Sequence, residues 1–151
     1  MTLYHGSKDI VEYPEIRKAR FNKDFYFGFY CTNIEKQAER WAIRYGKKGY
    51  INKYEYTENQ RLNILKFDKM TEEWLDFILN CRSGKDSTDY DLVVGGVAND
   101  KVFNTVELFF DGLIDKTEAI NRLRYEKPNL QISFRTEKAL SLLHFEGSET
   151  L

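Results

Sequence analysis

The sequence predicts a single α+β domain, and three observations lead to this prediction. The 151 residues include 42% hydrophobic and 15% aromatic residues, which is enough apolar material for one core. The predicted strands and helices follow each other in an irregular order, which fits a mixed α+β fold better than a regular βαβ series. No internal repeat, low-complexity tract or linker rich in Gly, Ser or Pro divides the chain. We therefore expect residues 1–151 to form one domain.

The N-terminal part predicts a strand, a loop and a helix. Residues 2–5 predict a short strand that ends at Gly6, and an irregular stretch then continues to about Asn22. Thr32 is a candidate N-cap, because Glu35 stands three residues later as in a capping box. Apolar residues then recur at helical spacing, namely Ile34, Ala38, Trp41, Ala42 and Tyr45. The helix is expected to end at the glycines that follow.

The middle of the chain predicts two strands and a second helix. Residues 50–56 alternate in character and carry aromatic bulk, which is typical of a half-buried strand, and a further strand is expected over 61–66. Thr71 precedes two glutamates in a first helical turn. The apolar face of this helix is predicted to contain Trp74, Phe77, Ile78 and Cys81.

The C-terminal third predicts two strands and three helices. The apolar run from Tyr90 to Val97 predicts a strand that is buried on both faces. Asn99 is placed to cap the helix that follows it. The remaining expected elements are helices over about 100–111 and 117–125, a strand over 130–134, a helix over 136–143 and a polar tail from 146.

The charge balance gives no sign of a nucleic-acid or membrane-surface protein. The chain has 23 Lys and Arg against 24 Asp and Glu, so no global field favours an anionic partner. The densest positive run, residues 17–23, is interpreted as a solvated loop face, with a local basic patch as the alternative.

The two cysteines and the termini indicate a cytoplasmic protein. Cys31 and Cys81 lie fifty residues apart without the spacing of a zinc site. They could form one disulfide, but a chain with an adequate core does not need it, and reduced thiols suit the cytoplasm. No segment approaches the ~20 apolar residues of a membrane helix, and the first residues lack the features of a signal peptide.

Three short stretches have residue types suited to hold a nicotinamide ribose: 3–7 (LYHGS), 28–32 (GFYCT) and 131–134 (QISF). Each alone is weak evidence, because a histidine at a strand end is ordinarily structural and an aromatic beside glycine is ordinarily core. In this order they resemble the diphtheria-toxin and poly(ADP-ribose) polymerase branch of the ADP-ribosyltransferases. The resemblance covers nearly the whole chain and includes a bacterial family of uncharacterised domains that begins with the same Tyr-His-Gly-Ser.

The resemblance implies a fold and a ligand. The fold would be of the ADP-ribosyltransferase type, with two small mixed or antiparallel sheets around an NAD cleft and flanking helices. NAD would be bound as a substrate by His5, Gly6 and Ser7, with the nicotinamide ring between Tyr30 and Trp41. Trp41 follows Tyr30 by eleven residues, or three helical turns, so it can return to the side of the helix that faces the site. Two aromatic faces suit a planar cationic ring.

The chain departs from the resembled family at the position of the usual catalytic glutamate, which is Gln131 here. The resemblance makes Gln131, His5 and Tyr30 the catalytic set. A glutamine can accept the hydrogen bond of a ribose hydroxyl but carries no charge, and losing one such electrostatic partner commonly costs ~10²–10³ in rate. Glu137, at an expected helix start, is better explained as a partner of the helix dipole.

Three functions remain open at this point. The expected one is transfer of single ADP-ribose groups to a macromolecule, with a protein acceptor favoured and a nucleic-acid acceptor left open. The alternatives are a catalytically silent NAD or ADP-ribose binding module and an NAD glycohydrolase.

The stretch 90–100 also resembles the bacterial family, with less obvious chemistry. Gly95 and Gly96 are interpreted as a bulge, and Asn99 or Asp100 as a helix cap, with target recognition or catalysis as the alternative. Asp91 within an apolar strand would be costly if it were buried unpaired. We expect Asp91 to meet backbone donors or an arginine, for which Arg82 and Arg44 are candidates.

Overall fold

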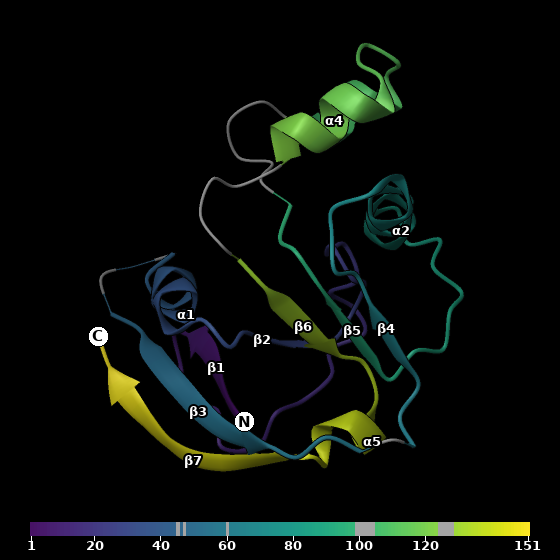
Figure 1. Ribbon diagram of the computed structural model, residues 1–151. Helices are drawn as coiled ribbons and strands as arrows, with labels where there is room; N and C mark the ends of the chain where they lie inside the picture. Colours follow the sequence, from purple (N-terminus) through teal and green to yellow (C-terminus); the bar gives the residue numbers. More distant parts are fainter. Residues whose placement is uncertain (45, 47, 60, 99–104, 124–128) are drawn as a thin grey trace.

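The computed structural model contains two small β-sheets and several helices that pack against them (Figure 1). The structure describes the whole chain except residues 45, 47, 60, 99–104 and 124–128. The predicted α+β class and the two small sheets are therefore confirmed.

The first sheet is antiparallel and has three strands, in the order β1-β3-β7. They are β1 (Thr2–Ser7), β3 (Tyr50–Tyr56) and β7 (Leu143–Thr150). Helix α1 (Glu35–Ala42) packs against β1 and β3. Because side chains alternate along a strand, Leu3 and His5 lie on one face of β1, and Tyr4 and Gly6 lie on the other.

The second sheet is mixed and has four strands, in the order β2-β6-β5-β4. They are β2 (Phe29–Cys31), β6 (Gln131–Phe134), β5 (Leu92–Gly95) and β4 (Ile64–Lys66); β4 and β5 are parallel, and the other pairs are antiparallel. The remaining helices are α2 (Glu72–Arg82), α3 (Thr105–Phe110), α4 (Lys116–Leu123) and α5 (Glu137–Leu140).

Two apolar cores hold the two sheets and the helices together. One contains residues from both sheets, including Leu3, Tyr54 and Phe134. The other lies between the four-stranded sheet and helices α2, α3 and α4, with Trp74 and Leu123 fully buried in it. Burial of aromatic and aliphatic side chains at both interfaces is the main term that stabilises the arrangement.

The two sheets are joined through β1 and β2. Tyr4 and Thr32 form an isolated antiparallel bridge, in which the N–H of each donates to the C=O of the other at 2.8 and 2.9 Å. Beyond this bridge β1 runs on to His5 and Gly6 without pairing to β2. His5 and Gly6, which belong to the predicted site, therefore lie directly beyond this bridge.

The end of the chain differs most from its prediction. The expected helix over 136–143 is a single turn, α5, and the expected polar tail is strand β7, which pairs with β3. The alternation of half-buried Phe145 with exposed neighbours suits an edge strand, and its ring packs on Tyr54 at 5.8 Å. The prediction of a polar tail was wrong because β3, the strand that pairs with β7, is about ninety residues away in sequence.

Smaller differences concern caps and bulges. The N-cap of helix α1 is Ile34, two residues after the expected cap Thr32, and no side chain caps the helix. The Thr32 hydroxyl accepts from the N–H of Ile34 instead. The pairing of β5 with β6 is regular and ends at Gly95, so the predicted bulge at residues 95–96 is absent there. The predicted caps Asn99 and Asp100 and the start of the helix expected over 100–111 lie outside the described residues.

The described parts of the chain contain no helix with the length and apolar character needed to cross a membrane. Cys31 and Cys81 are both buried free thiols, and burial raises the pKa of both, that of Cys81 to about 12. Both cysteines therefore act as small apolar residues of the core.

Candidate functional site

His5 lies at the junction of the two sheets, where β1 leaves β2. Its Nδ1 lies 2.5 Å from the carbonyl oxygen of Tyr30, and its ring stacks on Phe29 with centroids 4.1 Å apart. Burial lowers the pKa of His5 to about 4; the hydrogen bond to Tyr30 opposes this shift, and the charge of Lys23 adds to it. The ring is thus neutral at neutral pH. Since a carbonyl only accepts, Nδ1 carries the proton and Nε2 is left as an acceptor.

Tyr30 is held at its hydroxyl by the loop that precedes β2. The N–H of Phe25 donates to the Tyr30 hydroxyl at 3.0 Å, and this hydroxyl donates to the carbonyl oxygen of Tyr26 at 2.7 Å. Burial, and then the nearby Asp24 carboxylate, raise the pKa of Tyr30. The phenol stays protonated and its ring is fixed in place, so Tyr30 can offer a ring face but not a phenolate.

Gln131 begins β6 and is 5% exposed. Its Nε2 donates to Oδ2 of Asp24 at 2.9 Å and to the carbonyl oxygen of Gly96 at 3.1 Å. Both hydrogens of the amide nitrogen are therefore used. Among the described residues, nothing donates a hydrogen bond to its Oε1. The amide is held by its nitrogen end and presents its oxygen as an acceptor.

Asp24 is a site residue that the sequence analysis did not identify. It is 9% exposed and receives, besides Gln131, the N–H of Ala98 at 3.0 Å and the Arg82 guanidinium at 2.8 Å from Nε and 2.5 Å from Nη2. Its neighbours in sequence, Phe25 and Tyr26, hold the Tyr30 hydroxyl. The segment 24–26 thus connects Tyr30 with Gln131. It lies in an irregular loop without periodicity, so no sequence signal separated Asp24 from other loop carboxylates.

Gly6 contributes backbone groups to the candidate site. The N–H and C=O of Tyr4 point to β2, and by the two-residue period of a strand those of Gly6 point to the same side, away from β3. On its side-chain face, a Cβ would lie 1.9 Å from the carbonyl oxygen of Ala38 and 2.8 Å from the nitrogen of Ala42. Glycine at this position therefore also lets α1 lie directly on β1.

Trp41 and Ser7 are less closely tied to the other site residues. Trp41 is half-buried in the last turn of α1, and within the described part of the chain no ring contact joins it to Tyr30. The Ser7 hydroxyl accepts from the N–H of Asp9 at 3.2 Å. The roles predicted for Trp41 as the second wall of a slot and for Ser7 as a ligand contact stay predictions.

One basic side chain, that of Lys23, lies over Tyr30. The ammonium of Lys23 is 5.0 Å from the centroid of the Tyr30 ring. Burial first, and then the positive charges of Arg20, Arg17 and Arg44, lower the pKa of Lys23. Lys23, which belongs to the run interpreted as a solvated loop face, therefore lies against a residue of the predicted site and has other positive charges near it. This agrees with the alternative of a local basic patch.

Asp91 is not part of this site. Its Oδ2 accepts from the N–H of Asn63 at 2.9 Å, and its Oδ1 accepts from the Thr136 hydroxyl at 2.7 Å. Burial alone would raise the pKa of Asp91, but these two bonds and the charge of Lys138 together lower it. The expected backbone donor is present, whereas Arg82 pairs with Asp24.

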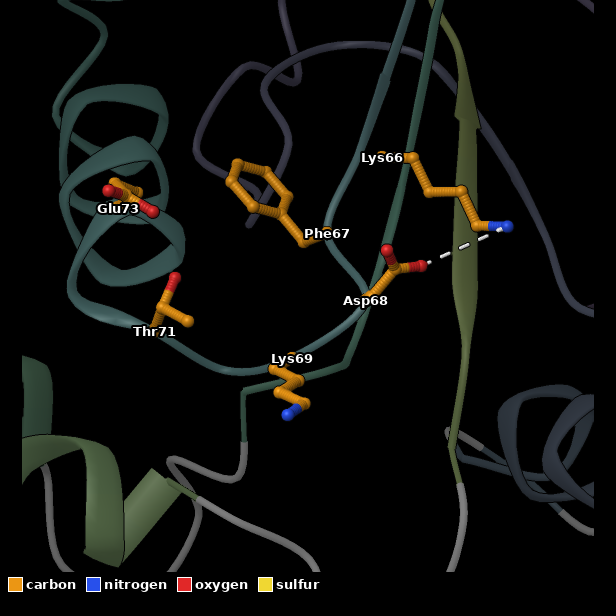
Figure 2. A pocket seen from close by; sticks show the side chains of 6 residues that line it. All are labelled: Lys66, Phe67, Asp68, Lys69, Thr71 and Glu73. Carbon is orange, nitrogen blue, oxygen red and sulfur yellow. Dashed lines mark ion pairs between the residues drawn. The ribbon is translucent and has the colours of Figure 1, made fainter.

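A separate hollow of about 340 Å³ opens between β4 and α2 (Figure 2). Figure 2 shows Lys66 and Asp68 pointing toward each other, 4.0 Å apart, while Phe67 points to the opposite side near α2. The hollow contains none of the predicted site residues and mixes charges of both signs; its lining is Lys66, Phe67, Asp68, Lys69, Thr71 and Glu73.

Within the described ranges, no group of three or more His, Cys, Asp or Glu side chains is arranged to hold a metal ion.

A family model described as "Protein of unknown function (DUF3990)" matches residues 1–145. The chain belongs to this family. No curated protein and no solved structure matches it. The DUF3990 match covers every residue of the candidate site, from His5 to Gln131, and Asp24 with them. The candidate site therefore lies within the DUF3990 domain, and only residues 146–151 lie beyond the match.

Proposed function

We propose that this DUF3990 chain binds NAD and transfers single ADP-ribose groups to a macromolecular acceptor, with release of nicotinamide. A protein acceptor is favoured because the overall charge is near zero. The observation that carries the proposal is the convergence of three segments distant in sequence. His5 is bonded to the backbone of Tyr30, and the loop 24–26 bonds both the Tyr30 hydroxyl and Gln131.

The resulting groups suit the nicotinamide end of NAD. The backbone N–H and C=O of Gly6, on the open side of β1, match the acceptor and donor of a carboxamide. The ring of Tyr30 offers a face for the cationic nicotinamide, and Trp41 is the proposed second wall. Nε2 of neutral His5 is an acceptor for a ribose hydroxyl.

Gln131 would act on the reacting ribose. Its free Oε1 can accept a hydrogen bond from the ribose 2′-hydroxyl and orient the sugar. In the reaction the glycosidic C–N bond breaks and its electron pair leaves with nicotinamide. The acceptor nucleophile bonds to the anomeric carbon and loses its proton to solvent. A side-chain amide stabilises the oxocarbenium-like sugar less than a carboxylate does, which favours single transfers over chain elongation.

Lys23 over Tyr30, with the arginine charges that act on it, supports an anionic ligand. NAD has a pyrophosphate next to the nicotinamide ribose, and clustered cations of like sign gain free energy when an anion joins them. The approach of Lys23 to the Tyr30 ring places one of these cations near the point where nicotinamide would stack.

Nicotinamide release from NAD by the purified protein, in the presence of cell extract as a source of acceptors, tests the proposal. We expect release by the wild type and its loss in His5→Ala and Tyr30→Ala. The matched controls are His144→Ala and Tyr13→Ala, which remove exposed side chains of the same types. Labelled ADP-ribose should appear on macromolecules.

The other outcomes identify the alternatives. Labelled ADP-ribose that stays free in solution would indicate an NAD glycohydrolase. NAD binding in calorimetry without release would indicate a silent binding module, and neither binding nor release would overturn the proposal.

A further inference from the structure

We propose that Asp24 is a positioning residue for the reaction: it orients Gln131 and polarises its amide, so that the pair performs the task for which a single carboxylate is usual at position 131. The inference rests on the proposed function. It adds a residue that neither the motifs nor the resemblance indicated.

The first step of the argument is the orientation of the amide. Asp24 is paired with Arg82 and is acceptor-only in its ionised form, so only the nitrogen end of Gln131 can face it. The carbonyl oxygen of Gly96 takes the second hydrogen of the same nitrogen. The opposite rotamer would place Oε1 of Gln131 against two acceptors. Asp24 and Gly96 together therefore select the orientation in which Oε1 remains available.

The second step concerns polarisation. A carboxylate that accepts from the N–H of an amide draws positive charge toward the nitrogen and increases the negative charge on the amide oxygen. This oxygen is the atom proposed to accept from the ribose hydroxyl. Arg82 binds Oδ1 of Asp24, whereas Gln131 binds Oδ2, so the ion pair and the amide use different oxygens.

The third step is the preorganisation of Asp24 itself. Oδ1 accepts two bonds from Arg82, and Oδ2 accepts one from Ala98 and one from Gln131. With four donors the carboxylate cannot rotate without breaking bonds, and it is almost fully buried. The reaction therefore needs no reorganisation of this charge, which is the condition for effective electrostatic assistance.

A purely structural ion pair is the competing explanation, and the chain contains a control for it. Asp86 and Arg135 form a second buried ion pair, with Nη2 of Arg135 2.6 Å from Oδ2 of Asp86 and both side chains 3% exposed. Asp86 bonds to Thr88 and Arg135 but not to Gln131. Removing its charge should affect folding without affecting the reaction.

The experiment measures kcat and KM for nicotinamide release, together with the urea midpoint, for Asp24→Asn, Gln131→Glu, the double variant with both changes, and Asp86→Asn. Asp24→Asn should lower kcat by about 10-fold or more with KM changed by less than about threefold. Asp86→Asn should lower the urea midpoint and leave kcat within about twofold.

The decisive comparison is between Gln131→Glu and the double variant, in which the amide and the carboxylate have exchanged positions. Gln131→Glu alone places two carboxylates side by side, so its kcat should depend on a new ionisation of the pair. The double variant again has one amide bonded to one carboxylate, and its kcat should equal or exceed that of the wild type. If Asp24→Asn does not fold, a kcat of the double variant above that of Gln131→Glu supports the proposal, and equal values overturn it.

Failure of this inference is distinct from failure of the proposed function. A wild type that releases nicotinamide, with Asp24→Asn and Asp86→Asn equal in kcat, overturns only the role of Asp24. A wild type without release overturns both.

Discussion

His5 is the residue whose chemical state the fold defines most clearly. In the unfolded chain a histidine titrates near pH 6.5, whereas burial lowers the pKa of His5 to about 4 in the folded protein. Between these values the unfolded state binds the additional proton, so the free energy of unfolding decreases as the pH falls. The contribution of His5 to the free energy of unfolding is fully present above about pH 6.5. It is lost as the pH drops toward 4.

We therefore expect His5→Asn to flatten the pH dependence of stability between about pH 6.5 and 4. Urea unfolding at intervals across this window measures the effect, with His144→Asn as the control because His144 is exposed. A His5→Asn variant with the same slope as the wild type would contradict the assignment of a buried neutral His5.

The remaining site residues differ in how far the sequence predicted them. His5, Tyr30 and Gln131 were found through short motifs, and the structure brings these three segments together. Asp24 and Lys23 were missed as candidate site residues, because the loop that carries them has no periodicity. The side chains that bond Asp24 are also distant in sequence. The partner of a buried charge is a property of the tertiary fold, so local patterns do not contain it.

At the scale of elements, the contact between α1 and β1 shapes the candidate site. Gly6 brings the backbone of the helix so close that a Cβ would overlap it. The same helix carries Trp41 in its last turn, so the distance between α1 and β1 determines where Trp41 lies relative to His5 and Gly6.

Gly6→Ala should therefore push α1 away and reduce the free energy of unfolding by about 1–3 kcal/mol, as overpacked core substitutions do. Thermal or urea unfolding measures this change. Gly46→Ala is the control, because a Cβ there would meet nothing within 4 Å. An unchanged stability of Gly6→Ala would show that helix and strand separate at no cost.

At the scale of the whole molecule, the charge is balanced overall but uneven locally. The net charge is −1, yet Lys23 lies over the Tyr30 ring and is near enough to Arg17, Arg20 and Arg44 for their charges to lower its pKa. Such a local excess attracts an anionic ligand without a global basic field, and ionic strength screens the attraction.

Lys23→Gln should raise the KM or Kd for NAD by about threefold to tenfold and reduce its dependence on salt. Calorimetry or kinetics at several NaCl concentrations measures both quantities. The exposed Lys85 provides the control substitution, Lys85→Gln. Equal salt dependence in the two variants would place the ligand's phosphates elsewhere.

The sequence by itself determined the α+β class and most elements. Strands β1, β3, β5 and β6 and helices α1 and α2 were predicted, because periodicity and capping act within a few residues. Only the tertiary structure decided that the C-terminal tail is a strand beside β3, that Gly6 lies against α1, and that Asp24 joins Arg82 to Gln131. These features depend on which distant segments meet, and a buried carboxylate or an edge strand acquires its energy from a partner that local sequence does not specify.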